Sequence, residues 1–152
     1  MINGYIPAAR FLPFLSWTDV AALPDKSNTV IVLPTGAIEQ HGPHLPCSVD
    51  SVISSGVAGH ALARLPATIP AYAIPPIVYG KSEEHLHFPG TLTLSGDTLL
   101  HTLLEIAESL YRAGFRKLLM INGHGGQPQI LQIACREMRL RHGDFIAIPH
   151  DV

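Results

Sequence analysis

Residues suited to metal chemistry gather in the segment that follows an apolar run at residues 29–33. Glu39, His41 and Asp50 lie there among glycines and prolines, which restrict the path of the backbone. Side chains alternate along an extended chain, so the spacing of Glu39 and His41 places both on the same side. Carboxylate oxygens and imidazole nitrogens are the mixture of ligands that zinc, manganese and iron accept. Asp50 stands where the loop meets the next predicted helix, and a carboxylate there can bridge two cations or simply cap the helix.

A second group of candidate ligands follows another apolar run, at residues 117–121. His124 has glycines on both sides, so its backbone can bend tightly and its ring can project over the strand end. Loops at strand ends are where α/β proteins place their chemistry, and two such loops predict one metal site built from both. An alternative is an anion- or nucleotide-binding loop at residues 122–126, because free N–H groups at the start of a helix attract anions. That segment lacks the G-x-G-x-x-G and Walker spacings, which favours the metal site.

Glu84, His85 and His87 form a third group, just before a turn at residues 88–91. We predict that Glu84 is a general base or a partner that orients a metal ligand. His85 is the second candidate catalytic residue. The remaining histidines considered are predicted to be structural, on helices or in the tail: His60, His101, His142 and His150.

Apolar periodicity divides the chain into alternating strands and helices. We predict strands at residues 29–33, 73–79, 117–121 and 145–148, the second of them at an edge or with an irregular start because it contains Pro75 and Pro76. We predict helices at residues 17–23, 51–65, 96–113 and 127–141, the third of them ended by a glycine. This alternation predicts a single α/β domain over residues 1–152, with a largely parallel sheet and helices on both faces. A sheet that ends on a strand leaves an edge uncovered, so we expect the chain to be the front part of a larger domain.

The composition indicates a globular protein and excludes several partners. The chain has 152 residues, of which 47% are hydrophobic and 14% are charged. Its formal net charge is -2 and basic residues form no run, so we predict no binding to nucleic acid. Apolar runs are too short to span a membrane and the first residues do not resemble a signal peptide, so we expect a cytoplasmic protein. Cys47 and Cys135 are predicted to be free thiols that pack as small apolar side chains.

Three motifs together resemble the creatininase (creatinine amidohydrolase) family. They are Gly-Ala-Ile-Glu-Gln-His-Gly-Pro-His-Leu-Pro at 36–46 with Asp50 after it, Glu-His-x-x-Phe-Pro-Gly-Thr at 84–91, and Asn-Gly-His-Gly-Gly at 122–126. The motifs follow the family's order over about residues 29–143, and the first is long and specific. The resemblance implies a three-layer α/β/α creatininase-like fold, and hydrolysis of a cyclic or linear C–N amide bond in a small molecule.

The resemblance also implies two divalent metal ions, zinc with manganese or iron. Carried over by motif, Glu39 and His124 would bind the first metal, His41 would bind the second, and Asp50 would bridge them. Water activated by the metals would attack the amide carbonyl, and Glu84 or a neighbouring histidine would pass a proton to the leaving nitrogen. The apolar-rich composition and the uncovered sheet edge agree with a homo-oligomer, and the resemblance implies a hexamer.

Two positions depart from the family pattern. Creatininases place a glutamate two residues after the histidine of the third motif, where this chain has Gly126, and the wider family takes that ligand from a later segment. The asparagine usual after the paired glycines is Gln127 here. We therefore expect a domain truncated at its C-terminus, the N-terminal two-thirds of the usual family domain. Two hypotheses follow: a metal-dependent amidohydrolase, or a truncated, non-catalytic homologue that folds or assembles without turnover.

Overall fold

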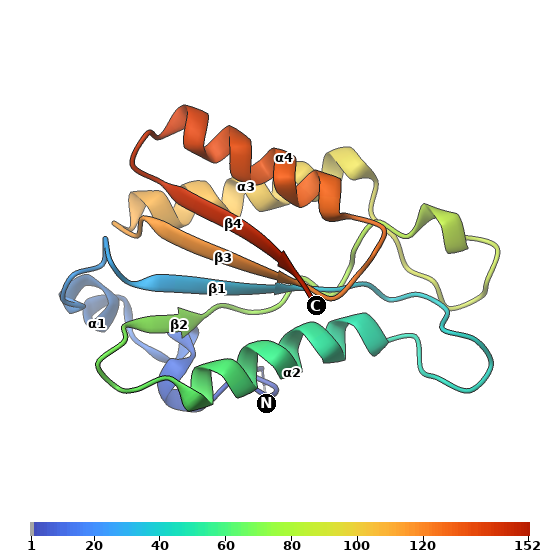
Figure 1. Ribbon diagram of the computed structural model, residues 1–152, viewed down its shortest axis with the longest axis horizontal. Coiled ribbons are helices and arrows are strands. Elements are labelled where there is room, and N and C mark those ends of the chain that lie inside the picture. The colour runs from blue at the N-terminus through green and yellow to red at the C-terminus, as the bar shows by residue number, and fades with distance from the viewer. Residues whose placement is uncertain (1) are drawn as a thin grey trace.

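A parallel four-stranded sheet forms the centre of the structure, a computed structural model that describes residues 2–152 (Figure 1). The strands are β1 (Val30–Thr35), β2 (Ala71–Ala73), β3 (Lys117–Asn122) and β4 (Ile146–Asp151), in the order β2-β1-β3-β4. The α-helices are α1 (Trp17–Ala22), α2 (Val49–Arg64), α3 (Gly96–Arg112) and α4 (Pro128–Arg141). Short 3-10 helices lie at Ala8–Arg10, Leu12–Phe14 and Glu83–His85. The predicted α/β fold with a parallel sheet is confirmed.

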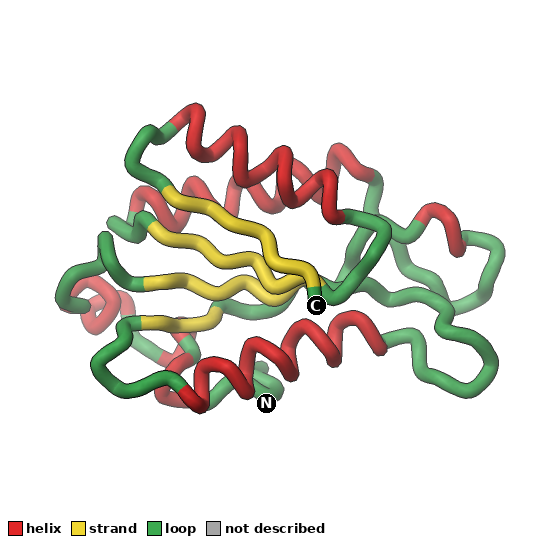
Figure 2. Tube along the Cα trace, viewed as in Figure 1, coloured by secondary structure: helices red, strands yellow, loops and turns green. Residues whose placement is uncertain are grey.

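Helices cover both faces of the sheet and make three layers (Figure 2). Ile31 and Met120 pack into the core formed with α3 and α4, whereas Val32 and Ile121 pack into the core formed with α2. Neighbouring residues enter different cores because side chains alternate between the two faces of a strand. Burial on both faces explains why the central strands β1 and β3 are apolar almost throughout.

Local sequence signals set the ends of two helices. At α1, Ser16 accepts a hydrogen bond from the N–H of Asp19, and the carboxylate of Asp19 accepts one from the N–H of Ser16. At α3, Ser95 accepts a hydrogen bond from the N–H of Thr98. Gly114, just beyond α3, has a φ of +100°, a left-handed conformation that favours glycine. Within residues 2–152, no helix is both long enough and apolar enough to cross a membrane.

The second strand is shorter than predicted and lies earlier in the chain. β2 covers Ala71–Ala73 and not 73–79, and it pairs with β1 in parallel. Pro75 and Pro76 have no N–H to donate, so the ladder with β1 cannot continue through them. Beyond β2 the chain keeps a hydrogen bond from the N–H of Ile74 to Val32 and an isolated bridge between Ile77 and Thr35, and it then turns away toward the site described below.

The last strand, β4, extends beyond the predicted range of 145–148 and forms one edge of the sheet. His150 therefore lies in this strand. The prediction that it lies on a helix or in the tail is wrong. Ile146 and Ile148 are 50% and 51% exposed. In the sheet they stand opposite Lys117 and Leu119 of β3. Their side chains therefore lie on the face of the sheet that α2 covers at the other strands. The expected uncovered edge is thus present in the described chain, and part of it is apolar.

Both cysteines are free, as predicted. Cys135 is 1% exposed in the core beside α3, and burial raises the pKa of its thiol to about 11. The thiol therefore stays protonated and packs as a small apolar group. Cys47, in the loop before α2, is only partly buried, so its packing is less complete than predicted.

Candidate metal centre

The segments that carry the predicted site residues leave the sheet at the same end. Glu39 follows β1 and His124 follows β3, while Glu84 and His85 lie between β2 and α3. Figure 1 shows the segments after β1 and β2 extending beyond the arrowheads of the strands. Because parallel strands all end on one side, residues far apart in the sequence meet there. The ion-pair and ligand distances below show that the four predicted metal ligands lie together.

His124 presents a nitrogen lone pair to two carboxylates. Its Nε2 lies 2.8 Å from the carbonyl oxygen of Lys81, which can only accept, so Nε2 carries the hydrogen. In the neutral ring Nδ1 is then an acceptor. Nδ1 lies 2.9 Å from Oδ2 of Asp50 and 3.3 Å from Oε1 of Glu39. Three acceptors that converge in this way need a cation between them, either a proton or a metal ion.

The surroundings of His124 raise its pKa. Burial of the ring by itself lowers the pKa, because it disfavours the charged imidazolium. The contact with Asp50, the bond to the Lys81 carbonyl and the negative charge of Glu39 act in the opposite direction and outweigh burial. The site therefore favours positive charge at Nδ1, which a metal ion can supply in place of a proton.

His41 presents the same arrangement to the other oxygen of Asp50. Its Nδ1 lies 3.2 Å from the carbonyl oxygen of Glu39, so Nδ1 carries the hydrogen. Nε2 is left with a lone pair and lies 2.9 Å from Oδ1 of Asp50. Asp50 thus directs one carboxylate oxygen at each imidazole. It does so from the first turn of α2, where the helix dipole stabilises a negative charge.

Two buried carboxylate oxygens in this cluster have no hydrogen-bond partner. They are Oε2 of Glu39 and Oδ2 of Asp50, on side chains that are 8% and 7% exposed. Oδ2 of Asp50 lies close to His124, but the contact lacks hydrogen-bond geometry. A buried charged acceptor without a partner is costly, and native proteins satisfy such groups with a donor or an ion. The chemistry of this set of side chains therefore fits a metal ion.

Glu84 joins the cluster from the segment after β2. Two groups of side chains lie close enough to hold an ion: Glu39, His41 and Asp50 in one, and Glu39, Glu84 and His124 in the other. Glu84 reaches this position because residue 126 is a glycine, since a Cβ there would collide with Oε1 of Glu84. The side chain that the sequence predicts as catalytic thus also lies within reach of a metal.

His85 lies at the rim of the cluster. Its Nδ1 is 3.3 Å from the side-chain nitrogen of Gln40, a donor, so its hydrogen is on Nε2. That Nε2 lies 4.0 Å from Oε2 of Glu39, too far for a direct hydrogen bond. His87 does not join the cluster, because it is exposed and packs against Phe88 with ring centroids 4.1 Å apart.

Sequence reasoning assigned no role to three buried polar residues around His124, namely Ser82, Asn122 and Gln127. They are 0%, 2% and 0% exposed, respectively. The Ser82 hydroxyl lies 3.2 Å from Nε2 of His124, and the Asn122 amide donates to the His124 carbonyl at 2.7 Å. The available signal was their place in the sequence, because each lies within five residues of a predicted site residue.

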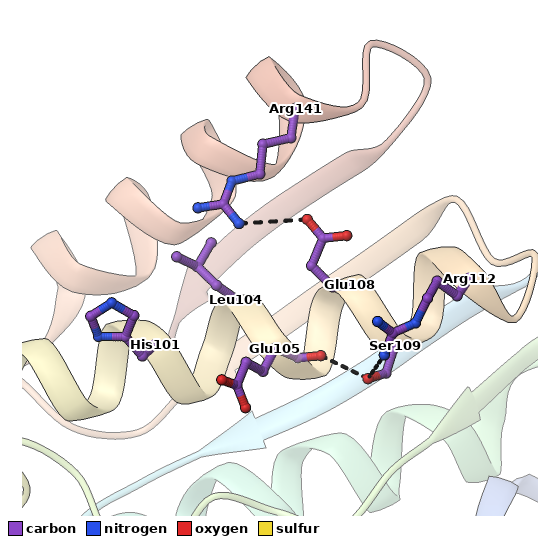
Figure 3. Close-up of a pocket in the computed structure, with 7 residues that line it drawn as sticks. All are labelled: His101, Leu104, Glu105, Glu108, Ser109, Arg112 and Arg141. Atoms are coloured by element: carbon purple, nitrogen blue, oxygen red, sulfur yellow. Dashed lines mark hydrogen bonds and ion pairs between the residues drawn. The ribbon is translucent and has the colours of Figure 1, made fainter.

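The cavities of the molecule do not all adjoin this cluster. A cavity of about 520 Å³ lies between α3 and α4, and none of the predicted ligands lines it (Figure 3). Its lining is His101, Leu104, Glu105, Glu108, Ser109, Arg112 and Arg141. A smaller cavity of about 270 Å³ is lined by His124 and its neighbours and by Asp151 at the end of β4. The smaller cavity is the one beside the candidate metal centre.

The comparison with protein families agrees with this arrangement. The model of the family named Creatininase, described as creatinine amidohydrolase, matches residues 13–151. The chain belongs to the creatininase family. The match includes every strand and helix from α1 to β4, and it confirms the resemblance that the three motifs indicate.

Curated relatives include enzymes with different names. A mycofactocin precursor peptide peptidase of Mycolicibacterium smegmatis is 36% identical over 125 residues, which cover 81% of this chain and 50% of the relative. A creatinine amidohydrolase of Pseudomonas putida is 34% identical over 138 residues, covering 85% of this chain and 52% of the relative. This chain therefore spans about half the length of the curated relatives that it matches.

Solved structures confirm the fold. A crystal structure of creatinine amidohydrolase (creatininase) superposes with a TM-score of 0.79 at 33% identity, covering 93% of this chain and 57% of that chain. A structure named "Creatininase Mn" gives a TM-score of 0.78 at 31% identity, covering 93% and 58%. A mutant creatininase of the Zn-Zn type gives 0.79 at 32% identity, covering 93% and 57%. The three-layer creatininase-like fold expected from the sequence is therefore correct.

Proposed function

We propose that this protein is a metal-dependent amidohydrolase that cleaves a cyclic or linear C–N bond in a small-molecule amide. The observation that carries the proposal is the position of Asp50 between two imidazole lone pairs, those of His41 and His124. Each of these contacts joins two acceptors, and a divalent cation beside them would remove the repulsion. The names of the relatives, an amidohydrolase and a peptide peptidase, support hydrolysis of this type of bond.

In this proposal Glu39, Asp50 and His124 would hold one metal ion, and His41 with Asp50 would hold the second, so that Asp50 would serve both positions. Zinc with manganese or iron suits such nitrogen and oxygen donors, and solved creatininases include Zn-Zn and Mn forms. When bound, the two ions would supply an activated water and would polarise the amide carbonyl.

Glu84 and His85 have the proton-transfer roles in the proposal. The Glu84 carboxylate lies beside Glu39 and His124, where it can take up a proton and pass it to the leaving nitrogen. His85 directs its Nε2 hydrogen toward Glu39 from 4.0 Å, too far for a direct hydrogen bond, so this N–H can donate to a polar group of a substrate at the rim of the site. A substrate would enter from the end of the sheet on which these side chains lie.

Metal analysis and an activity screen test the proposal together. The purified chain would be dialysed against Zn²⁺ and Mn²⁺, analysed for bound metal, and assayed against a panel of small amides that includes creatinine and short peptides. We expect about one tightly held metal per chain. Glu39 serves the first position, so the second has two protein ligands, His41 and Asp50, and a catalytic zinc usually has three. A folded chain that binds no metal and hydrolyses no amide would contradict the proposal.

A second candidate is a non-catalytic homologue that folds or assembles without turnover. The limited ligand set of the second metal position favours it, because Glu39 is assigned to the first position and leaves only His41 and Asp50 for the second. Metal binding without hydrolysis of any amide in the panel would support this candidate. The anion-binding alternative is less favoured, because the Glu84 carboxylate lies over Gly126, where a bound anion would meet negative charge.

We also propose that the protein is a homo-oligomer, a hexamer by family resemblance. The half-exposed Ile146 and Ile148 of β4 form an apolar surface that association would cover. An apolar cavity of about 320 Å³ between α2 and the sheet adds to the uncovered surface. Sedimentation of a stable monomer at micromolar concentration would contradict the proposal. The cytoplasmic location stays a prediction.

A further inference from the structure

Gln127 is completely buried at the point where the three site segments meet. Its Nε2 donates to Oδ1 of Asn122 at 2.9 Å and to the carbonyl oxygen of Gly36 at 3.3 Å. Its Oε1 accepts from the N–H of Lys81 at 3.3 Å. Gly36 begins the segment after β1, Lys81 lies in the segment after β2, and Asn122 ends β3. One amide group therefore connects all three segments that carry candidate ligands.

The partners fix the orientation of this amide. Exchanging its oxygen and nitrogen would place the oxygen against two acceptors and the NH₂ group against the N–H of Lys81. Gly80 permits the close approach, since a Cβ there would lie 2.5 Å from Oε1 of Gln127. Both N–H groups of the side chain are used, and a fully bonded polar group in a buried site is held rigidly.

Two routes lead from Gln127 to His124. In the first, Gln127 holds the N–H of Lys81, and the carbonyl of Lys81 lies 2.8 Å from Nε2 of His124. That carbonyl keeps the hydrogen on Nε2 and leaves Nδ1 as a lone pair. In the second, Gln127 holds Asn122, whose Nδ2 donates to the backbone carbonyl of His124 at 2.7 Å. Both the ring and the backbone of this ligand depend on Gln127.

We infer that Gln127 is a positioning residue for metal binding. It holds His124 in the tautomer and orientation in which Nδ1 can accept a cation, and it keeps the Glu39 and Glu84 segments in register with it. The inference rests on the proposed function, because it concerns the metal centre proposed above. Partners that orient a metal ligand typically contribute 10- to 100-fold to metal affinity.

The test replaces Gln127 with glutamate, which has nearly the same shape but no N–H groups. We expect Gln127→Glu to weaken Zn²⁺ binding by about 10- to 100-fold in calorimetric titrations. The matched control is Gln132→Glu, which makes the same change on an exposed position of α4 and is expected to leave the Zn²⁺ affinity unchanged. A Zn²⁺ affinity in Gln127→Glu equal to that of the control would overturn the inference.

A metal-free measurement separates this inference from the proposed function. Nitrogen-15 NMR of the imidazole, recorded at alkaline pH where the ring is neutral, reports the tautomer of His124. We expect the Nε2–H form in the wild-type chain and a mixture of forms in Gln127→Glu. The same tautomer in both proteins would overturn the positioning role. A wild-type chain that binds no Zn²⁺ would instead overturn the proposed function.

If Gln127→Glu does not fold, the wild-type chain still tests the connection. The amide N–H of Lys81 should be protected from hydrogen exchange, because it is bonded to a fully buried side chain. Exchange as fast as that of an open loop would overturn the inference, and strong protection would support it.

Discussion

Two clusters of carboxylates and histidines in this molecule differ in how their charges are paired. Glu108, on α3, lies 3.5 Å from Nη1 of Arg141 on α4 (Figure 3). It also lies 2.9 Å from Nε2 of His142, so it faces two donors. The hydrogen bond to His142 lowers the pKa of Glu108. At the candidate metal centre, Asp50 contacts one nitrogen each of His41 and His124. The hydrogen of each ring is on its other nitrogen, which faces a backbone carbonyl, so the nitrogen beside Asp50 has none. Residues of the same types form an ion-pair cluster in one place and an electron-rich pocket in the other.

The difference shows that residue type alone does not define a metal site. What matters is which atoms remain acceptors after every nearby hydrogen bond is assigned. Around Glu108 the positive charge comes from side chains of the chain itself. Around Asp50 the neighbouring backbone carbonyls take the imidazole hydrogens, so a cation has to come from outside.

The largest effect is expected for Asp50→Ala. Removal of this carboxylate should abolish metal binding at both positions, because it faces both imidazoles and would balance the charge of both ions. Metal analysis after dialysis measures the stoichiometry. The matched control is Glu108→Ala, which removes a carboxylate from the other cluster and should leave bound metal unchanged. An unchanged stoichiometry in Asp50→Ala would show that this residue does not bridge metals.

A smaller effect concerns pH in the absence of metal. The folded-state pKa of His124 is raised above 6.5, so its protonation stabilises the fold fully below the unfolded-state value. This contribution is lost as the pH rises through the raised pKa. We expect His124→Gln to lack it, so that the two proteins differ most in stability under acidic conditions. Urea denaturation across a pH series measures the difference, and a gap that does not change with pH would contradict the assignment.

The pH series also has a consequence for the metal. A proton and a metal ion compete for Nδ1 of His124, so Zn²⁺ affinity should fall as the pH drops below the raised pKa. Calorimetric titrations at several pH values would show this. An affinity that is independent of pH would indicate that His124 is not a ligand.

The smallest effect is expected for Arg141→Ala. The side chain is 44% exposed and its contact with Glu108 is long, so solvent screens the pair. We expect a loss of stability near the detection limit of urea denaturation, with metal binding and any amidase activity unchanged. If this change reduced metal binding, the contrast between the two clusters would be wrong.

Much of the fold follows from the sequence because its signals are local. The capping box at Ser16, the cap at Ser95 and the glycine at 114 define α1 and α3 without help from the rest of the chain. The second strand was misplaced because apolar periodicity continues across Pro75 and Pro76. The two prolines end the ladder, and only pairing with β1 shows that it begins at Ala71.

The candidate ligands were also predictable, since Glu39, His41, Asp50 and His124 stand in motifs that resemble one family. Their protonation was not predictable. It depends on the backbone carbonyls of Glu39 and Lys81. Every residue has such a carbonyl, so only the folded structure shows which of them lie against an imidazole. Glu84 was predicted as a catalytic residue, and only its distance from His124 adds a possible metal contact.

The sequence by itself determined the alternating α/β pattern, the family and the chemical types of the site residues. These follow from side-chain periodicity and from residue identity, and both are properties of the amino-acid sequence. Tertiary structure alone decided that Gln127 connects the three site segments and that Asp50 lies between two imidazole lone pairs. Both features join atoms of residues that are far apart in the sequence. A hydrogen bond needs a short distance and a suitable angle between its atoms, and only the folded backbone fixes these.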